Sequence, residues 1–519
     1  MKTLKKVLLF SLATLVALTF NACKKDAEIT VTGTVTNSLG AGIEGATITT
    51  TGSVVNTATT SANGAYTINV AKNGSLTFAK DGYSSQSKEV EGEKTIDIIL
   101  SFEPFATYFS TAFNASVDPE FTGGVVPTSS NLGNPVTPSN SWFTTTTFKG
   151  AVDPAATPWY DGWSFFSRIA QGTTTSDAIT NGSAGTVTVT DAGMTASGNT
   201  INWVKDTTYI LDGFVYVNSG QTLTIQAGTV IKGAAGTGAD ASALVVARGG
   251  KIMAQGTASE PIIFTYEGDN GGTEATTRGQ WGGLIILGKA SLNAEVTELA
   301  IEGIPTTESR GLYGGSEDAD NSGVLSYVSI RHGGSDIGAD NEINGLTLGA
   351  VGSGTTIEYV EIVGNKDDGI EWFGGTVNAK WLISAYCGDD ALDYDEGYRG
   401  NNQYVIVYQD PATADRGGEH DGGPSSCETC TPYAKPVFYN ATFVGNSGSR
   451  IITFRDNAGG EYHNSIFTGF GAGIDIEDLK DQDQDSYKQW EDGNLKLTNN
   501  IFHCPEVGST GAELFTVSN

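Results

Sequence analysis

Short apolar runs, each a few residues long and bounded by Gly, Asn or Asp, recur along most of this chain. The pattern is clearest between residues 356 and 408, where one passage of sequence occurs twice in succession. Two acids and two large apolar residues are matched by similar residues 22 positions later: Asp367 by Asp389, Asp368 by Asp390, Ile370 by Leu392 and Trp372 by Tyr394. A unit of this length cannot bury its own apolar face, so the units must stack on one another. The repeat therefore predicts a solenoid.

The apolar runs predict strands, because they are rich in Val, Ile, Tyr and Trp and keep no helical period. Parallel stacking of such strands, with glycine and asparagine at the corners, predicts an all-β fold, a right-handed parallel β-helix, over residues 205–519. Residues 445–454 are expected to form a later coil, with Ile451 in the position of Ile370 and Phe454 in that of Phe373. Residues 410–435, in between, are expected to form an external loop at one corner.

The composition favours turns over long charged helices, because 68 of the 519 residues are Gly and only 17% are charged. The formal net charge is -30 and the sequence pI is near 4.3. Such an acidic chain argues against nucleic acid and against an anionic membrane surface as partners. An acidic surface instead attracts cations.

The N-terminus has a basic start, an apolar run from Val7 to Phe20, and a small residue before Cys23. This arrangement resembles a bacterial lipoprotein signal peptide over residues 1–22. The resemblance implies cleavage before Cys23, lipidation of that cysteine, and a location at the outer membrane, on the cell surface. The charged residues 24–28 are similar to the export tags of surface lipoproteins in Bacteroidota. A plain secretory signal or an uncleaved anchor are the alternatives.

Residues 28–100 form a first module of alternating strands. A Gly33-x-Val35 strand, a Gly45-Ala46-x-Ile48 strand, an Asn63-Gly64-x-Tyr66 turn and a turn at Lys80 follow one another. This succession resembles the carboxypeptidase regulatory-like domain. The resemblance implies a small β-sandwich that serves as a spacer or docking unit and carries no catalytic residue.

Residues 101–204 contain scattered prolines and many aromatic residues, among them Trp142, Trp159, Trp163 and Phe165. So many aromatic side chains predict a packed, irregular collar and not a free linker. A solenoid would otherwise expose the core and strand edges of its first coil, so the collar is expected to cap that end. A carbohydrate-binding platform is the functional alternative for the same residues.

The acids of the central repeat are candidate cation ligands, because parallel stacking places equivalent residues of successive coils about 4.8 Å apart. Ile370 and Trp372 are expected to point inward, so Glu371 and its counterpart Asp393 should point outward. Carboxylates this close raise one another's pKa unless a cation lies between them, and calcium accepts such oxygen ligands. The candidate calcium ligands are Asp367, Asp368, Glu371, Asp389, Asp390, Asp393 and Asp395. The alternative is that the acids in the turns only bind local backbone amides.

Enzymatic chemistry at these stacked carboxylates would need an acid or base beside them. Glu371 and Asp393 could form a hydrolase pair, and Arg399, Arg416, Lys366 or His420 could serve as the base of a lyase. No motif selects among these candidates. A chance pair is common in so acidic a chain, and a non-catalytic role is the preferred interpretation.

Cys427 and Cys430 form a CxxC motif, which suits a redox pair, half of a zinc site or a disulfide. No helix follows the motif and no second CxxC accompanies it, so a Cys427–Cys430 disulfide is favoured. The pairing of Cys387 and Cys504 stays open.

Residues 205–505 resemble the pectate-lyase-like β-helix superfamily. The phrases 281–288 and 341–348 are similar to surface lipoproteins of Bacteroidota. The superfamily includes polysaccharide lyases, glycoside hydrolases and adhesins without catalytic activity. The preferred expectation is a lipid-anchored surface protein that binds glycans or a partner protein of the outer membrane through its β-helix, with calcium as a structural ion. A calcium-dependent polysaccharide lyase or a glycoside hydrolase is the alternative, and a purely architectural subunit comes third.

Overall fold

The computed structural model describes residues 28–36, 42–51, 55–80, 83–92, 94–100, 135–138, 140–337, 342–424, 426–479, 484–504, 506–508 and 511–518. Cys23 and the signal peptide expected over residues 1–22 lie outside these residues. The chain divides into two compact units, Met1–Pro104 and Phe105–Asn519.

The first unit is a small β-sandwich of two sheets. One sheet has the order β4-β1-β7 and the other β3-β2-β5-β6. Its strands are β1 (Glu28–Thr36), β2 (Thr47–Thr51), β3 (Thr57–Thr59), β4 (Ala65–Ala71), β5 (Ser75–Lys80), β6 (Tyr83–Glu89) and β7 (Ile98–Ile99). Val31, Val35, Ile48 and Phe78, each fully buried, belong to the core of this unit. The alternating apolar positions of residues 28–100 thus form the predicted sandwich.

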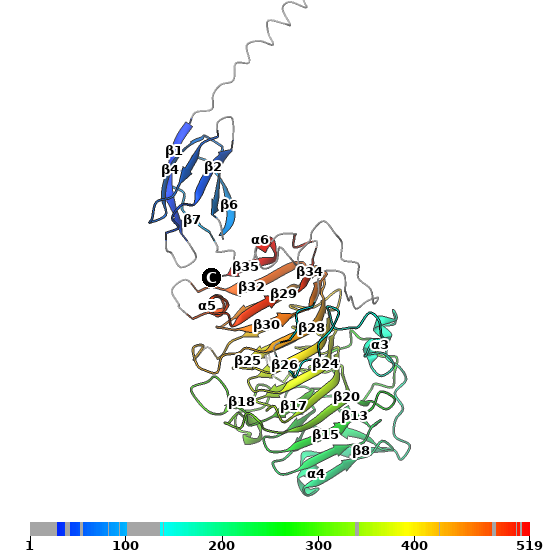
Figure 1. The fold of residues 1–519 in the computed structure, drawn as a ribbon. Helices are drawn as coiled ribbons and strands as arrows, with labels where there is room; N and C mark the ends of the chain where they lie inside the picture. The colour runs from blue at the N-terminus through cyan, green and yellow to red at the C-terminus, as the bar shows by residue number, and fades with distance from the viewer. Residues whose placement is uncertain are drawn as a thin grey trace, which may run out of the picture. The chain divides into compact units, whose positions relative to one another are not determined.

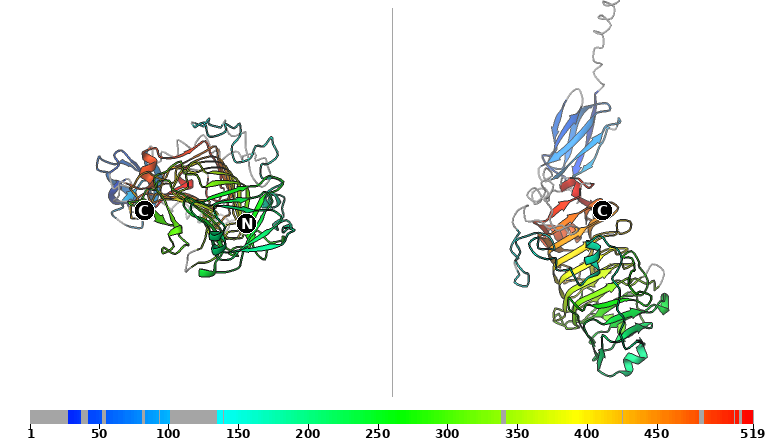
Figure 2. Two further views of the ribbon diagram at one scale, coloured as in Figure 1. Left: turned by 90° about the horizontal axis from the view of Figure 1, so that it is seen from below. Right: turned by 90° about the vertical axis from the view of Figure 1, so that its right-hand side faces the viewer.

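The second unit is a parallel β-helix, as the repeat predicted, with three strands to a typical coil (Figures 1 and 2). We name its three faces A, B and C by the strands that stack in each. Face B is one ten-stranded sheet. Its strands are β11 (Phe214–Val217), β14 (Ala243–Val246), β17 (Leu284–Leu287), β21 (Leu346–Gly349), β23 (Ile370–Phe373), β25 (Leu392–Asp395), β27 (Glu419–Asp421), β29 (Arg450–Arg455), β32 (Ala472–Glu477) and β35 (Phe515–Ser518).

Faces A and C are joined in one sheet, because five long strands bend and contribute to both faces. The bent strands are β20 (Gly323–Arg331), β22 (Thr356–Val363), β24 (Asn378–Ala385), β26 (Asn401–Tyr408) and β28 (Val437–Val444). Face A also contains β8 (Thr186–Val189), β10 (Thr208–Leu211), β13 (Val230–Gly233), β16 (Ile262–Tyr266), β31 (Ile466–Thr468) and β34 (Ile501–His503). Face C also contains β9 (Thr200–Trp203), β12 (Thr222–Ile225), β15 (Lys251–Gln255), β30 (Gly460–His463) and β33 (Leu495–Thr498).

The parallel stack begins earlier than residue 205. Strand β8 pairs with β10, and β9 pairs with β12, both in parallel. The short helix α4 (Asp191–Ala196) lies between β8 and β9, beside β11, where later coils have a face B strand. Met194 from this helix is buried in the core of the stack. Helix α4 therefore covers the first coil.

The remaining short elements lie in turns and loops of this unit. They are α3 (Phe165–Ala170), β18 (Leu299–Ala300), β19 (Leu312–Tyr313), α5 (Ser486–Glu491), α6 (Gly511–Leu514) and the 3-10 turns Gly238–Asp240 and Ser309–Gly311.

The aromatic segment expected to cap the first coil instead runs along the outside of face A. We call residues 135–138 and 140–180 the strap. The Gly150 N–H donates to the Asn464 carbonyl at 2.8 Å, and the Phe165 N–H donates to Glu361 Oε1 at 2.7 Å. Trp163 and Phe165 are buried with Ile383, which faces outward from β24. Within residues 101–204, helix α4 does cover the first coil, but the prediction was wrong for the aromatic segment, because face A is apolar on both sides and needs an outer cover.

The bends between faces C and A require left-handed backbone at residues that rarely adopt it. The φ angles are 50° at Tyr327, 53° at Tyr359, 59° at Trp381 and 62° at Tyr404. Their rings stack, with centroids 4.3, 4.4 and 5.7 Å apart in that order. The stack of aromatic rings compensates part of the backbone strain, because each coil repeats the bend directly beside the last.

Candidate cation-binding site on stacked coils

The central repeat is stacked in the predicted register. Ile370 pairs with Leu392, Glu371 with Asp393, and Trp372 with Tyr394 in parallel strands β23 and β25. Ile370 and Trp372 are fully buried in the core. Glu371 and Asp393 have the opposite parity and lie on the outer side of face B. The 22-residue offset is therefore one coil.

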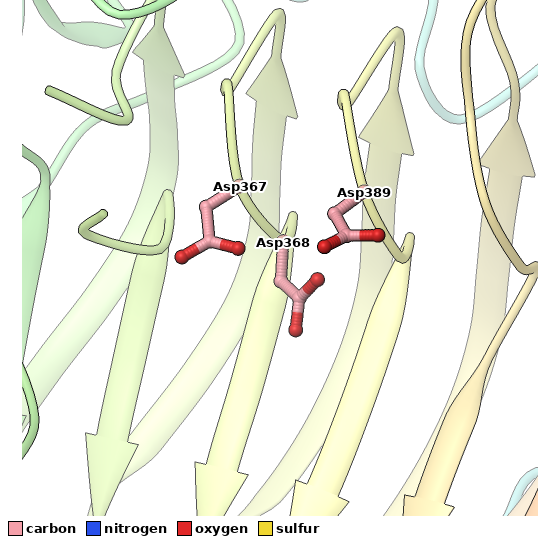
Figure 3. Close-up of side chains that lie close together, drawn as sticks. All are labelled: Asp367, Asp368 and Asp389. Atoms are coloured by element: carbon pink, nitrogen blue, oxygen red, sulfur yellow. The ribbon is translucent and has the colours of Figure 1, made fainter. Parts of the chain in front are cut away.

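The turns that precede β23 and β25 bring their carboxylates together. Oxygen atoms of Asp367, Asp368 and Asp389 all lie within 4.8 Å of one another. Figure 3 shows these three side chains converging from two successive coils. Two further groups meet the same spacing and share members with the first: Asp368, Glu371 and Asp393, and Asp389, Asp390 and Asp415. We call Asp367, Asp368, Glu371, Asp389 and Asp393, together with Glu302, the acidic cluster.

Burial makes this concentration of negative charge costly. Asp368 and Glu371 are each only 7% exposed. Burial is the main reason why the pKa values of Asp368, Glu371 and Asp393 are raised well above normal, and the neighbouring carboxylates raise them further. The same causes raise the pKa of Asp367 to about 7. At neutral pH these groups need protons or a cation to be stable.

Arginines neutralise the neighbouring acids but not the cluster itself. Arg416 Nη1 lies 3.3 Å from Asp390, 2.7 Å from Asp415 and 3.0 Å from Glu419. Arg455 makes the next ion pairs along the face, 2.9 Å from Glu419 and 2.7 Å from Asp421. Among the described residues, the ion pairs involve no carboxylate of the acidic cluster.

Two residues outside the repeat complete the surroundings of the cluster. Asn344 donates to Glu302 at 3.0 Å and also to Glu371. Burial raises the pKa of Glu302, and the nearby carboxylate of Glu342 raises it further. Asp393 Oδ1 is buried and accepts no hydrogen bond from the described residues. A buried carboxylate oxygen without a donor is the kind of atom that a metal ion satisfies.

A hard divalent cation fits this donor set, because every ligand is oxygen and the carboxylates come from two rigid coils. Calcium suits the site best, since it takes six to eight oxygen ligands in irregular geometry. Either Asp367, Asp368 and Asp389, or Asp368, Glu371 and Asp393, would hold it. When bound, the ion would replace the protons that the raised pKa values otherwise demand.

Two profiles of known families match the chain. A carboxypeptidase regulatory-like domain matches residues 30–101, and a pectate-lyase like beta helix domain matches residues 193–515. The second match covers more than half of the chain. The chain belongs to the pectate-lyase-like β-helix family. No curated protein matches it.

This pectate-lyase-like β-helix protein keeps some predicted site residues apart from the cluster. Asp390 accepts from the Arg416 N–H at 2.6 Å and is paired with the Arg416 side chain. Asp395 lies further along β25, where burial and the Glu396 carboxylate raise its pKa well above the ordinary value. Neither residue belongs to the groups that combine Asp368 with Asp367 or Glu371.

His420 points into the core, so the prediction that it could lie beside the stacked carboxylates as a base was wrong. Its ring is fully buried and stacks on Tyr394 with centroids 4.0 Å apart. Nε2 lies 2.7 Å from the Tyr462 hydroxyl, and burial lowers the pKa of the imidazole to about 3. His420 is therefore a neutral core residue of β27, a strand within the stretch that was expected to be only an external loop.

The later coil is shifted by one residue from its predicted alignment. Phe454 follows His420 and Tyr394 in one column, so it occupies the position of Trp372 and not that of Phe373. Thr453 accordingly continues the column of Glu371 and Asp393.

Glu302, Asn344 and Asp415 were not identified as site residues from the sequence. Glu302 and Asn344 lie in the long connections on either side of β20, outside the repeat, so no periodicity points to them. Asp415 is different. The pair Asp415-Arg416 lies one coil after the pair Asp389-Asp390, and the two pairs could have been aligned from the sequence.

The four described cysteines of the pectate-lyase-like β-helix protein divide into two kinds. Cys427 and Cys430 form a disulfide, with Cα atoms 5.4 Å apart. Cys387 and Cys504 are buried and unpaired. No helix among the described residues is both long and apolar enough to cross a membrane.

Proposed function

We propose that this protein is a non-catalytic, lipid-anchored binding protein of the bacterial outer membrane, which presents its β-helix to glycans at the cell surface. A pectate-lyase-like β-helix domain fits a glycan-related role. The observation that carries the non-catalytic assignment is the absence, among the described residues around the acidic cluster, of a basic side chain free to accept a proton.

Each candidate base is already engaged. Arg416 is shared by Asp390, Asp415 and Glu419. Lys366 is paired with Asp336 and with Glu342. Arg399 is paired with Asp318, and His420 is buried in the core. A lyase needs a base within reach of the substrate, and a cation held by two carboxylates is a poor proton acceptor.

The hydrolase alternative is disfavoured by access. Glu371 is nearly buried and bonded to Asn344, so a glycosidic oxygen has no clear path to its carboxyl group. Both members of the pair also have pKa values raised well above normal, whereas a retaining enzyme needs one ionised nucleophile.

The assay compares binding with turnover on the same preparations. The full-length chain is incubated with acidic and neutral polysaccharides, and unsaturated products are followed by ultraviolet absorbance and reducing ends by a colour assay. Retention of a polysaccharide without either product supports the proposal. Turnover that is lost in Glu371→Ala and Asp393→Ala would establish the enzymatic alternative.

We further propose that calcium binds the acidic cluster as a structural ion. Metal analysis of the dialysed protein, with Asp367→Asn/Asp389→Asn as the matched variant, measures the stoichiometry. We expect about one calcium per chain and its loss in the variant. Equal calcium content in both proteins contradicts this assignment.

The anchor rests on the sequence pattern at Cys23. Metabolic labelling with a palmitate analogue should mark the wild-type chain and leave Cys23→Ser unlabelled. Protease digestion of intact cells then tests display on the outside. Co-purification of an outer-membrane protein with the labelled chain would indicate a protein partner in place of a glycan.

A further inference from the structure

A groove of about 350 Å³ opens on face C, apart from the acidic cluster on face B. Eight of its nine lining residues are polar or aromatic, among them Trp142, Thr356, Glu358, Asn378, Lys380 and Trp381. Most strap aromatics are buried against face A, so they cannot form the open carbohydrate platform that the sequence allowed. Trp142 is only half-buried and borders this groove.

The floor of the groove is a small grid of polar side chains. Ile357 on β22 is in the core, so Thr356 and Glu358 lie on the outer side. They pair in register with Asn378 and Lys380 on β24. Neighbours in such a grid are about 4.8 Å apart across strands and about 6.6 Å apart along a strand. This spacing suits the hydroxyl groups of a single sugar ring.

Two indoles form the walls. Lys380 Nζ lies 4.5 Å from the ring centroid of Trp142 and 5.9 Å from that of Trp381. Tyr359 and Tyr404 stack on the two sides of Trp381, so that indole presents its edge. Trp142 has no stacked partner among the described rings, since its contact with Phe143 is edge-on at 88°. Lys380 lies over one face of the Trp142 ring, so the opposite face is the surface for the C–H groups of a sugar.

The floor also retains hydrogen-bonding capacity. Glu358 Oε1 accepts from the Ser326 hydroxyl at 3.2 Å, which leaves Oε2 as an acceptor. Asn378 Oδ1 accepts from the backbone N–H and the amide of Asn401, at 2.9 and 2.7 Å. Those two bonds fix the amide orientation and leave its N–H groups as donors among the described residues. A fixed donor beside a fixed acceptor matches a pair of vicinal hydroxyls.

The charge of the groove selects against an acidic sugar. Lys380, the one cation among the described lining residues, already donates to the Trp142 carbonyl at 3.0 Å and to Thr144 Oγ1 at 3.3 Å. Its cross-strand partner Glu358 is an anion. The whole chain carries a net charge of -30, which repels a polyuronate at long range.

We propose that this groove binds one residue of a neutral glycan chain, with sugar hydroxyls on Glu358 and Asn378 and a C–H face on Trp142. The inference rests on the proposed glycan-binding function and specifies its place and its ligand class. Asn140 and Thr144 of the strap are bonded to Asn401 and Gln403 of β26, so the glycan chain would leave the groove away from β26.

Isothermal titration calorimetry of the full-length chain tests this assignment. The probes are the hexasaccharides of glucose, xylose and mannose, each beside hexagalacturonate. The variants are Trp142→Ala and Glu358→Gln, and the matched controls are Trp490→Phe on α5 and Glu267→Gln in the turn after β16. We expect at least one neutral hexasaccharide to bind, with affinity lowered tenfold or more by both variants and unchanged in both controls. Thermal unfolding of each protein verifies that the fold is retained.

The possible failures separate the groove from the broader function. If a neutral hexasaccharide binds both variants as tightly as wild type, the groove is not its binding site, although the protein still binds glycans. Binding of hexagalacturonate alone overturns the ligand class. Binding of none of the four probes overturns this inference, and retention of a longer polysaccharide in the turnover assay then decides whether the proposed function also fails.

Discussion

The carboxylate of Glu361 on β22 accepts hydrogen bonds from the backbone N–H groups of Phe165 and Phe166, at 2.7 and 3.1 Å. These N–H groups begin helix α3 of the strap and would otherwise lack partners. The same carboxylate accepts from the Ser329 hydroxyl at 2.5 Å and lies 3.8 Å from the buried Arg331. One fully buried acid thus joins the strap to two successive coils.

Replacement of this acid should be strongly destabilising. Glu361→Gln keeps one acceptor oxygen but leaves Arg331 without its counter-charge, so we expect a loss of about 2–4 kcal/mol. Guanidinium unfolding followed by tryptophan fluorescence measures the loss, since all eight tryptophans lie beyond residue 140. Glu358→Gln on the same strand is the control, with an expected change under about 0.5 kcal/mol. Equal losses in both variants would contradict the role of Glu361.

The acidic cluster predicts that, without a bound cation, the stability of the fold decreases as pH rises. The pKa of Asp367 is raised from 3.8 to about 7 in the fold, so the folded chain binds more protons than the unfolded chain between these values. Stability is therefore greatest at low pH and declines as pH rises through this window. Melting temperatures in EDTA should decrease from pH 5 to pH 8.

Calcium should reverse this decline, because it replaces the lost protons. At pH 8 and a concentration 100 times Kd, it should raise Tm by about 3 °C or more, with little effect at pH 5. A Tm that is independent of calcium at both pH values excludes the cation from the cluster.

Removal of a single charge at Asp368 should have the same effect as a bound ion. Asp368 Oδ1 accepts from the Asp390 N–H at 2.9 Å, and the amide oxygen of Asp368→Asn can keep this bond. Without calcium at pH 8, we expect this variant to be more stable than wild type. Its Tm should then show a smaller response to calcium. Asp240→Asn, in an exposed turn, is the control and should behave like wild type.

The bend at Tyr359 allows a test of backbone strain. Asn440 and Asn464 occupy the same bend in later coils, with φ of 55° and 54°. Asn tolerates this left-handed backbone better than Ala does. Both Tyr359→Asn and Tyr359→Ala lose the ring stack, but the Ala variant should be less stable by about 1 kcal/mol. Denaturant unfolding measures the difference, and a more stable Ala variant would contradict the assignment of strain.

The sequence predicted the β-helix and the register of its central coils because two copies of the repeat are adjacent and equally long. Asp367 and Asp389 could be placed together on that basis alone. The register failed at Phe454, since the turn between β28 and β29 is one residue longer than the turn between β22 and β23. His420 was assigned to the wrong side because the short strand β27 was not recognised, and the direction of its side chain depends on that strand.

Two further features depend on contacts between distant segments, which periodicity does not encode. Glu302 reaches the cluster from a long connection with no repeat. The strap aromatics were recognised as packed, but their position was not. A clue lies in the consecutive apolar residues Leu382 and Ile383, which show that face A is covered on both sides.

The strap also sets an order of events during biosynthesis. Residues 135–180 leave the ribosome before any coil, yet they are held by Glu361 and by Asn464. Each coil contacts mainly its neighbours, so early coils can assemble as soon as they emerge. Their apolar flank can be covered only once Glu361 and the strands up to β26 have been made, so the strap must wait for coils that come later in the chain. Its last contact, at Asn464, forms when most of the coils are in place.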